Sequence, residues 1–335
     1  MLRRAFFATV TSLALAGPGF AQTEMPFALD WQFEGPAAPY FMANEKGHFE
    51  AEGLIVEITP GQGSLDAIPK VATGAFPVGF ADMASLIKFL DQNPDAPVTA
   101  VMMFYDKPAF SIVGRKSLGI EEPKDLEDRV LGAPPPDGAW AQFPVFASEN
   151  DIDVSKVKVE PVGFPTREPM LAEGQVAAVT GFSFTSFLNT IRLGVPEEDM
   201  TVLLMADYGL DLYGNAIIVN TDFARENPEK VTGFLRAIAK GLQDTINDPE
   251  AGIAAMVSRN PAMDKDLELR RLELALRDNI VTDWVRENGV GGIDDARFAN
   301  SLEQLAVTYE FRNTPDASRY FDSSYLPDDG SLKVE

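Results

Sequence analysis

The sequence predicts an α/β protein made of two lobes with a cleft between them. Short apolar stretches alternate along the chain with stretches in which apolar residues recur every three to four positions, which is typical of alternating strands and helices. The chain has 335 residues, of which 45% are hydrophobic. It is therefore long enough to bury two cores of ordinary domain size.

A faint internal repeat supports two similar lobes. In each half of the chain a helix ends at glycine, a strand follows, and a Gly-Phe pair lies near the end of that strand. The repeated positions are Ala72, Gly74, Gly79 and Phe80 in the first half, and Ala172, Gly174, Gly181 and Phe182 in the second. Because the spacings differ, duplication of one unit stays a hypothesis.

The first lobe is expected to begin with alternating strands and helices. Its strands are expected at residues 27–29, 54–58, 78–80 and 98–104. A short helix between the first two strands ends at Gly47, since glycine accepts the positive φ angle of a helix end. Ser64 is placed to cap a helix that ends at Gly74, and Asp82 to cap the next helix.

The second lobe is expected after a strand at residues 110–114 and a turn-rich segment at 116–124. Further strands are expected at residues 129–132, 157–162, 176–180 and 201–206, with a helix at 139–150. A strand at 215–219 then returns the chain to the first lobe. The remainder is almost wholly helical, with apolar spacing at residues 231–246, 251–258, 267–278 and 297–309.

These elements divide the mature chain into two lobes and a tail. Lobe I is expected to comprise residues 22–110 and 212–312, and lobe II residues 111–211. The tail, residues 313–335, is rich in Pro, Asp and Ser and is expected to be a loosely ordered terminus. The chain therefore crosses between the lobes twice.

Residues 1–21 are predicted to form a secretory signal peptide. Arg3 and Arg4 precede an apolar run, and small residues then lead to a cleavage point after Ala21. The apolar run is shorter than the roughly 20 residues that a membrane-spanning helix needs. No later stretch is long and apolar enough to span a membrane. We expect a soluble protein of the periplasm that has no lipid anchor and no stable membrane insertion.

The charge and the lack of cysteine exclude several functions. The chain has 28 basic and 51 acidic residues, a net charge of -23, which becomes -25 when Arg3 and Arg4 are removed. This charge argues against a nucleic-acid partner, and acidic faces keep a secreted protein soluble. With 0 cysteines there are no disulfides, thiol catalysis or zinc–thiolate sites. We expect neither a metal nor a cofactor.

The segment at residues 30–53 resembles a known family. Its Asp30-Trp31 pair and the pattern K-G-x-F-x-x-E-G at residues 46–53 resemble the entry segment of periplasmic substrate-binding proteins of ABC importers. The branch includes nitrate, sulfonate and taurine binders and binders of thiamine pyrimidine precursors. The resemblance implies a type II periplasmic-binding-protein fold with two hinge crossings, closure on a ligand, and an ABC permease with its ATPase as partners. A monomer is expected.

The ligand of such a fold is expected beyond the carboxyl ends of the strands, where aromatic and acidic residues are frequent in this chain. Trp31 is expected to stack on a planar ring, and Glu34 and Asp207 to accept hydrogen bonds from ring amines. The ligand-binding prediction comprises Trp31, Glu34, Tyr40, Ser64, Asp82, Asp137, Arg167, Phe182, Ser183, Asp207, Tyr213 and Asn215. Ser64, Ser183 and Asn215 are the expected neutral hydrogen-bond partners.

Several of these residues also have purely structural interpretations. Tyr40 fits ordinary core or hinge packing, Asp82 fits a helix cap, and Asp137 before Gly138 fits a turn. Arg167 favours a different ligand, since it could hold a sulfonate, carboxylate or phosphate. A pair with Glu168 or Glu173 is the structural alternative for Arg167. The surplus of acids and aromatics favours a nitrogen heterocycle over a small anion.

The residue inventory argues against an enzyme. His48 is the single histidine, and it is expected in an exposed turn remote from the cleft. The pyrimidine-synthesising relatives of this fold depend on a cysteine-rich motif and histidines, as the resemblance implies. We expect a solute-binding component of an ABC importer with no catalytic residues. The alternatives are an alkylsulfonate, taurine or other small-anion binder and, more remotely, a hydrolase or lyase on the same fold.

Overall fold

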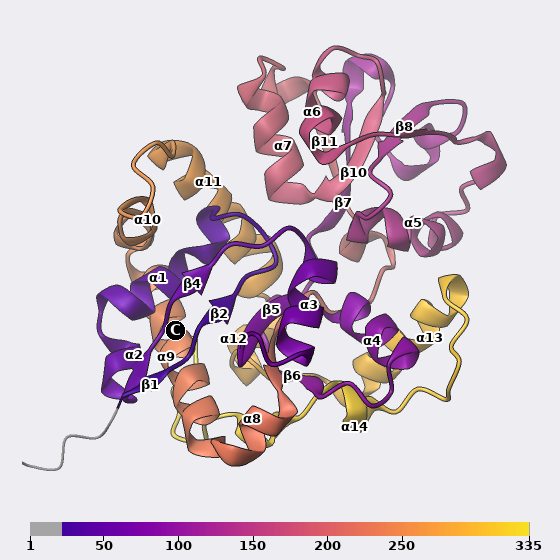
Figure 1. The fold of residues 1–335 in the computed structure, drawn as a ribbon. Helices are drawn as coiled ribbons and strands as arrows, with labels where there is room; N and C mark the ends of the chain where they lie inside the picture. Colours follow the sequence, from indigo (N-terminus) through magenta and orange to yellow (C-terminus); the bar gives the residue numbers. More distant parts are fainter. Residues whose placement is uncertain (1–21, 335) are drawn as a thin grey trace, which may run out of the picture.

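The structure is a computed structural model that describes residues 22–334. The predicted signal peptide and its cleavage point after Ala21 lie outside these residues. Figure 1 shows two lobes, each built around a β-sheet with helices on its faces. The fold is that of periplasmic binding proteins, as the sequence predicts.

The sheet of lobe I has five strands in the spatial order β4-β2-β5-β12-β6. Their bounds are β4 (Ile58–Thr59), β2 (Phe27–Ala28), β5 (Val78–Asp82), β12 (Asn215–Asn220) and β6 (Val98–Met103). β12 runs antiparallel to β5 and to β6, whereas β2 is parallel to β4 and β5. A separate parallel pair joins β1 (Thr23–Glu24) to β3 (Leu54–Ile55).

The sheet of lobe II has five strands in the order β9-β8-β10-β7-β11. Their bounds are β9 (Lys158–Pro161), β8 (Val130–Ala133), β10 (Ala178–Phe182), β7 (Phe110–Arg115) and β11 (Met200–Leu204). β7 is antiparallel to β10 and β11, and β8 is parallel to β9 and β10. The two sheets therefore have the same topology, and in each the antiparallel strand is the one that enters after a crossing.

The helices of the first half are α1 (Ala38–Glu45), α2 (His48–Ala51), α3 (Ser64–Ala72), α4 (Met83–Gln92), α5 (Gly138–Glu149), α6 (Phe164–Ala172) and α7 (Ser183–Arg192). Those of the second half are α8 (Thr221–Glu226), α9 (Pro228–Asn247), α10 (Pro249–Val257), α11 (Lys265–Ala275), α12 (Asp283–Asn288), α13 (Asp295–Thr308) and α14 (Ala317–Tyr320). Helices α8, α9 and α10 pack on elements of lobe I, and α13 packs against α5 of lobe II.

The internal repeat is present, but its register differs from the prediction. α3 and α6 begin at residue numbers that differ by 100, as do β5 and β10 and also α4 and α7. Each first helix is followed by a glycine with a positive φ angle, 77° at Gly74 and 74° at Gly174. In this register Gly79 and Phe80 correspond to Val179 and Thr180. The predicted match of Gly79-Phe80 with Gly181-Phe182 is therefore wrong.

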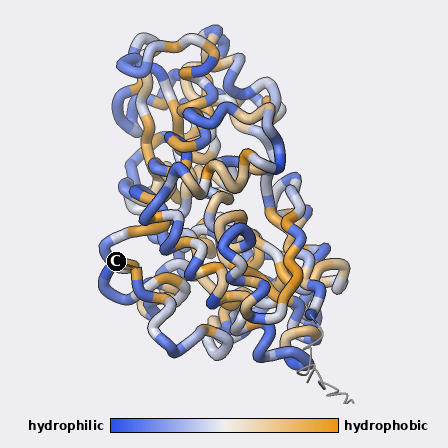
Figure 2. Tube along the Cα trace, turned by 90° about the vertical axis from the view of Figure 1, so that its left-hand side faces the viewer, coloured by the Kyte–Doolittle hydropathy of each residue, from blue (hydrophilic) through white to orange (hydrophobic). Residues whose placement is uncertain are grey.

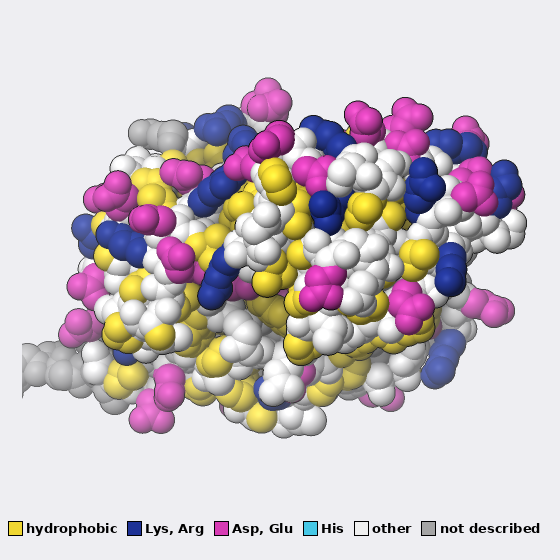
Figure 3. Space-filling model, turned by 90° about the horizontal axis from the view of Figure 1, so that it is seen from above, with side chains coloured by type: hydrophobic (Ala, Val, Ile, Leu, Met, Phe, Trp, Pro, Cys, Tyr) yellow, Lys and Arg dark blue, Asp and Glu magenta, His cyan; other side chains and the backbone are white. Residues whose placement is uncertain are grey.

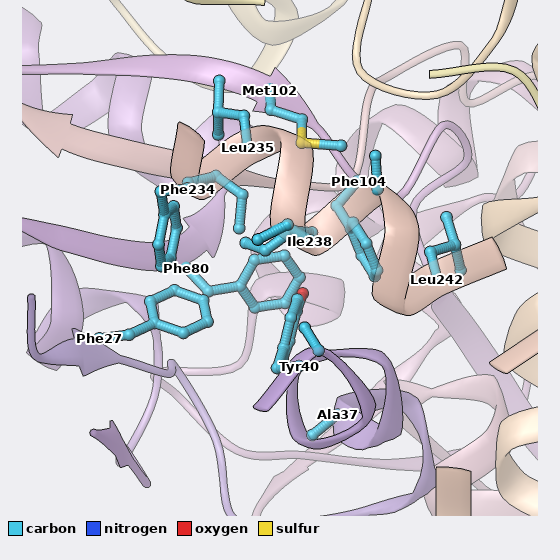
Figure 4. Packing of buried hydrophobic residues seen from close by; sticks show 14 of the residues in the cluster. Phe27, Ala37, Tyr40, Phe80, Met102, Phe104, Phe234, Leu235, Ile238 and Leu242 are labelled. Atoms are coloured by element: carbon cyan, nitrogen blue, oxygen red, sulfur yellow. The ribbon is translucent and has the colours of Figure 1, made fainter. Parts of the chain in front are cut away.

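The alternating residues of the strands supply two faces to the core of lobe I. On β12, Ile217 and Val219 join the cluster beneath α1, α9 and α10, while Ala216 and Ile218 join the cluster beneath α3 and α4. Figure 4 shows the first cluster, in which Phe27, Phe234 and Tyr40 pack closely. Figure 2 shows hydrophobic stretches running through the inside of both lobes. The second cluster continues through α5 and α13, so one apolar cluster contains buried residues of both lobes.

The C-terminal residues pack against lobe I and do not form the loose terminus that was expected. Phe321 forms a bridge with Ala100 of β6, and Tyr320 and Phe321 are buried. The Asp91 carboxylate accepts hydrogen bonds from the amides of Arg312 and Asn313. These apolar and capping contacts outweigh the Pro, Asp and Ser content on which the prediction was based.

The surface carries the acidic surplus of the sequence. Figure 3 shows Asp and Glu side chains spread over one face among fewer Lys and Arg side chains. Within residues 22–334, none of the helices has both the length and the apolar composition that crossing a membrane demands.

Candidate ligand-binding site

A pocket with a volume of about 110 Å³ lies between the two lobes. Lobe I contributes the loop after β2, the end of β5 and the start of α3. Lobe II contributes the loop after β8, the start of α6 and the end of β10. The lining residues are Asp30, Trp31, Gln62, Gly63, Ser64, Leu65, Asp82, Ser85, Phe110, Pro136, Asp137, Gly138, Phe164, Arg167, Phe182 and Thr185. We call it the main pocket.

The lobe I wall of the main pocket is a hydrogen-bonded acidic surface. Asn215 Nδ2 donates to Asp30 Oδ2 at 2.6 Å, and Ser64 Oγ donates to the same oxygen at 3.3 Å. Ser64 Oγ also accepts from the Asp82 amide at 2.9 Å. Ser64 does not cap α3, whose N-cap is Gly63, so the predicted capping role of Ser64 is wrong. Its hydroxyl instead connects two carboxylate-bearing loops.

Burial raises the pKa of both carboxyl groups of this wall. Desolvation raises the pKa of Asp30 from 3.8 to about 7, against the hydrogen bonds from Asn215 and Ser64 that lower it. Desolvation also raises the pKa of Asp82, although this side chain accepts a hydrogen bond from the Ser85 amide as the N-cap of α4. Asp82 Oδ2 is buried without a hydrogen-bond partner in the described residues. This wall therefore favours a ligand that donates hydrogen bonds or carries positive charge.

The lobe II wall contains a buried ion cluster. Arg167 Nε and Nη2 donate to Glu168 Oε1 at 2.9 and 2.6 Å, and Arg167 Nη1 lies 3.9 Å from Asp137 Oδ2. Asp137 caps α5 and accepts a hydrogen bond of 2.6 Å from Thr180 Oγ1. Desolvation raises the pKa of Asp137, and Arg167 partly opposes this rise. The charge of Arg167 is therefore offset by two carboxylates, which weakens it as an anion site.

Aromatic side chains from the two lobes meet at the main pocket. Trp31 of lobe I and Phe164 of lobe II contact edge to face, with ring centroids 5.3 Å apart. Two facing rings that enclose a third must be about 7 Å apart, since stacked rings need about 3.5 Å on each side. Trp31 and Phe164 therefore have to separate before a planar ligand can lie between them. Phe182 at the end of β10 lines the same pocket.

A second cavity, with a volume of about 40 Å³, adjoins the main pocket. The two share Asp30, Trp31 and Phe182. The predicted residues Glu34 and Tyr40 line this second cavity. Glu34 Oε2 accepts a hydrogen bond of 2.7 Å from Thr185 Oγ1 of lobe II and lies 3.6 Å from Arg271 Nε.

The structure brings eight of the twelve predicted residues into these two cavities. They are Trp31, Glu34, Tyr40, Ser64, Asp82, Asp137, Arg167 and Phe182. Asn215 lies just behind the wall and acts on Asp30 through its side-chain amide. Ligand contact by any of these residues stays a prediction.

Three predicted residues lie away from the cavities. Asp207 is exposed and pairs with Lys107 at 3.3 Å, so it does not face the cleft as predicted. Tyr213 is buried under α13, where its hydroxyl accepts a hydrogen bond of 2.7 Å from the Asp294 amide. Ser183 begins α7, and its amide donates to the Ala109 carbonyl at 2.8 Å. Neighbouring turns and strand ends therefore direct these three side chains elsewhere.

The sequence analysis missed several lining residues. Phe164 and Thr185 lie in the first turns of α6 and α7, where their sequence context resembles that of ordinary helix residues. The offset of 100 in the internal repeat could have found Phe164, because it occupies the place of Ser64. Asp30 lines both cavities but is not among the predicted ligand-binding residues.

Neither a metal centre nor the histidine lies in this cleft. No group of three or more His, Asp or Glu residues between residues 22 and 334 is placed to hold a metal ion. His48 begins α2, and its Nε2 lies 2.6 Å from Asp244 Oδ2. It is partly buried in that pair and is not the exposed turn residue that was expected.

Curated relatives are similar over most of the chain. The riboflavin-binding protein RibY of Chloroflexus aurantiacus is 25% identical over 300 residues, which cover 87% of this chain and 82% of the relative. The formylaminopyrimidine-binding protein of Halalkalibacterium halodurans is 24% identical, with 69% and 68% covered. A 4-amino-5-hydroxymethyl-2-methylpyrimidine phosphate synthase of Aspergillus parasiticus is 23% identical, with 82% and 84% covered. Binding proteins and enzymes are thus both among the relatives.

Solved structures share the fold at lower sequence identity. A protein of Bordetella bronchiseptica matches with a TM-score of 0.70 at 16% identity, covering 91% of this chain and 96% of that one. The periplasmic aliphatic sulphonate-binding protein of Escherichia coli matches with a TM-score of 0.66 at 12% identity, covering 85% and 86%. The family model described as "NMT1/THI5 like" matches residues 36–252. This match covers more than half of the chain, which therefore belongs to the NMT1/THI5-like family.

Proposed function

We propose that this protein is the extracytoplasmic solute-binding component of an ABC importer and that it captures a small planar nitrogen heterocycle between its lobes. One observation carries the proposal: the main pocket combines aromatic rings from both lobes with two buried carboxyl groups, Asp30 and Asp82, on one wall. Such a wall suits ring amines, and the aromatic rings suit a flat ligand. The names of two relatives, a riboflavin-binding and a formylaminopyrimidine-binding protein, point to the same ligand class.

The mechanism that we propose is closure of the lobes about their two crossings. Trp31 and Phe164 belong to different lobes, so a ring stacked between them contacts both lobes and holds them at a defined separation. A ligand can shift the opening equilibrium only by its difference in affinity for the two states. The closed form would then be recognised by a membrane permease. Export by the predicted signal peptide at residues 1–21 and a monomeric state in the periplasm belong to this proposal.

The main alternative ligand is a small anion such as an alkylsulfonate, bound by Arg167. Arg167 lines the main pocket, which supports this alternative. Its guanidinium already faces Glu168 and Asp137, so an anion would have to compete with two carboxylates. We therefore favour the heterocycle.

A catalytic function is the second alternative, since some relatives are named as synthases. The main pocket and the second cavity are lined by no histidine among the described residues. With 0 cysteines in the chain, thiol chemistry is also missing. We therefore propose binding without turnover.

A thermal-shift panel tests the proposal. The panel comprises pyrimidines, riboflavin, taurine, other sulfonates and nitrate. A ligand present at about a hundred times its dissociation constant stabilises the folded state by roughly 2.7 kcal/mol. We expect stabilisation by amine-bearing heterocycles, and stabilisation by sulfonates alone would refute the heterocycle. Mass spectrometry of the stabilising ligand after prolonged incubation would reveal turnover if the protein were an enzyme.

A further inference from the structure

Within residues 22–334, the second cavity is lined by aromatic, small apolar, amide and acidic side chains and by no basic one. Among the described residues, Asp30, Glu34, Tyr40 and Tyr105 supply its ionisable groups. It is continuous with the main pocket at Asp30, which lines both. Its volume of about 40 Å³ corresponds to about three water-sized groups, since one such group needs roughly 10–15 Å³ on this measure.

Tyr40 presents a buried hydroxyl group without a partner. Its side chain is 1% exposed, and its hydroxyl makes no hydrogen bond in the described part of the chain. Phe27, at 5.1 Å between ring centroids, and Phe80, at 5.8 Å, hold the ring edge to face. Figure 4 shows the ring surrounded by the hydrophobic side chains of the lobe I core. Packing therefore fixes the position of a polar group that still needs a hydrogen-bonding partner.

The charged and phenolic groups of the cavity lie close enough to influence one another. Burial raises the pKa of Tyr40 and of Tyr105, and the charge of Asp30 raises both further. The negative charge of Glu34 is partly compensated by the hydrogen bond from Thr185 and by the nearby guanidinium group of Arg271. The side chain of Asp30 accepts hydrogen bonds from the neutral side chains of Asn215 and Ser64, and none of the salt bridges among residues 22–334 involves it. Among the described residues, the Asp30 carboxylate is therefore the acidic group of this cavity that has no positively charged partner.

We propose that the second cavity is a subsite for a short amine-bearing substituent of the ligand, with Asp30 as the opposite charge and the Tyr40 and Tyr105 hydroxyls as acceptors. An ammonium group has three donors, which matches three acceptor groups, whereas a hydroxyl group has one donor. The volume admits a substituent of about two or three heavy atoms. The inference rests on the proposed solute-binding function and names the part of the ligand that the main pocket does not hold.

A probe without a ring tests the subsite directly. At about pH 8, above the pKa of about 7 of the buried Asp30 carboxyl group, ethylammonium is titrated into protein that carries isotope-labelled tyrosine. Ethanol serves as a probe of similar size and no charge. We expect ethylammonium to shift the resonances of Tyr40 and Tyr105 in a saturable manner and to bind at least several times more tightly than ethanol. If ethylammonium leaves both resonances unshifted, or if ethanol binds equally well, the cavity holds only water and the assignment is overturned.

Tyr40→Phe removes the hydroxyl group and keeps the packed ring. We expect this variant to weaken ethylammonium binding about three- to tenfold, the effect of one lost hydrogen bond. Tyr213→Phe is the matched control, because Tyr213 is also 1% exposed but its hydroxyl accepts from the Asp294 amide outside both cavities. Unchanged binding in Tyr40→Phe, or equal weakening in both variants, contradicts the proposal.

Picoline and picolylamine separate this inference from the proposed function, because these rings differ by one amino group. We expect picolylamine to bind more tightly, and Tyr40→Phe to reduce that advantage. If neither ring binds while ethylammonium does, the heterocycle is wrong and the subsite stands. If both rings bind equally, the proposed function stands and the subsite falls.

Discussion

The two walls of the main pocket come from sheets of the same topology and differ in their side chains at equivalent positions. Ser64 and Asp82 of lobe I occupy the places that Phe164 and Phe182 occupy in lobe II. An aspartate also follows each of the equivalent strands β2 and β8, but the lobe II aspartate, Asp137, faces Arg167. At the two equivalent positions named above, lobe I therefore carries a hydroxyl and a carboxyl group, and lobe II carries two aromatic rings. The comparison teaches that ligand chemistry in this fold depends on a few strand-end and helix-start positions.

The strongest test of this comparison removes the cation of the lobe II wall. Arg167→Met leaves Glu168 and Asp137 buried without their partner, so we expect unfolding to become easier by about 3–5 kcal/mol in denaturant titrations. Arg225→Met is the control, since Arg225 pairs with Asp222 at the exposed surface, where such pairs contribute at most about 1 kcal/mol. Similar losses of stability in the two variants would show that the ion cluster of lobe II stabilises the folded state no more than an exposed ion pair does.

The acidic wall of lobe I should make stability depend on pH. Folded Asp30 keeps its proton to about pH 7, whereas the unfolded chain releases it near the ordinary pKa of 3.8. The folded state therefore binds more protons between these two values, and stability falls as pH rises through this window, by up to about 1.4 kcal/mol per pH unit. Asp30→Asn should reduce the slope measured by denaturant titrations at several pH values.

Asp82 and Asp137 have raised pKa values as well, so part of the slope should remain in Asp30→Asn. A slope as steep in the variant as in the unchanged protein would mean that Asp30 is ionised in the folded state at low pH. The lobe I wall would then be more polar than its burial indicates.

Removing the aromatic group of lobe I at the mouth of the pocket should weaken ligand binding. Trp31→Ala is expected to cost about 1–3 kcal/mol of affinity for a planar heterocycle, the usual contribution of one stacking aromatic. Calorimetry measures the change with the heterocycle that gives the largest thermal shift. Trp140→Ala is the control, because Trp140 stacks on Phe143 outside both cavities. Equal affinity in Trp31→Ala and the unchanged protein would assign stacking to Phe164 alone.

The smallest expected effect concerns the hydroxyl that connects the two carboxylate loops. Ser64→Ala removes a donor to Asp30 and an acceptor from the Asp82 amide, so we expect a stability loss of about 1 kcal/mol. Ser155→Ala, which loses a hydrogen bond to Asp153 at the exposed surface, should change stability less. A larger loss in Ser155→Ala would argue against a special role for Ser64.

Much of the fold followed from the sequence because its signals are local. Short apolar stretches located most strands of the two sheets to within a few residues, although the strand expected at residues 54–58 is two short strands, β3 and β4. Asp82 caps α4 as expected, whereas Asp137, which was expected in a turn, caps α5. The prediction for the C-terminal tail was wrong because the tail is held by residues far away in the sequence, Asp91 and Ala100. Local composition carries no information about such partners.

The placement of the predicted site residues depends on the same distinction between local and distant contacts. Aromatics and acids after strands pointed to the cleft in which the two cavities lie, and ligand binding there stays a prediction. Asp207 resembled the other acids in sequence, but Lys107 of the other crossing holds it at the surface. Phe164 resembled an ordinary helix residue, and only the correspondence of the two lobes identifies it. Which residues of the two lobes meet depends on how the whole chain folds, and the sequence of one segment does not contain that information.

The position of β12 has a consequence for the order in which the chain can become structured. β12 lies between β5 and β6, yet residues 110–204 of lobe II precede it in synthesis. Until residue 220 emerges, β5 and β6 have no strand between them and remain open sheet edges, which are prone to pairing with other chains. All strands of the lobe II sheet, in contrast, come from one continuous segment. The sheet of lobe II can therefore be completed before β12 joins the sheet of lobe I.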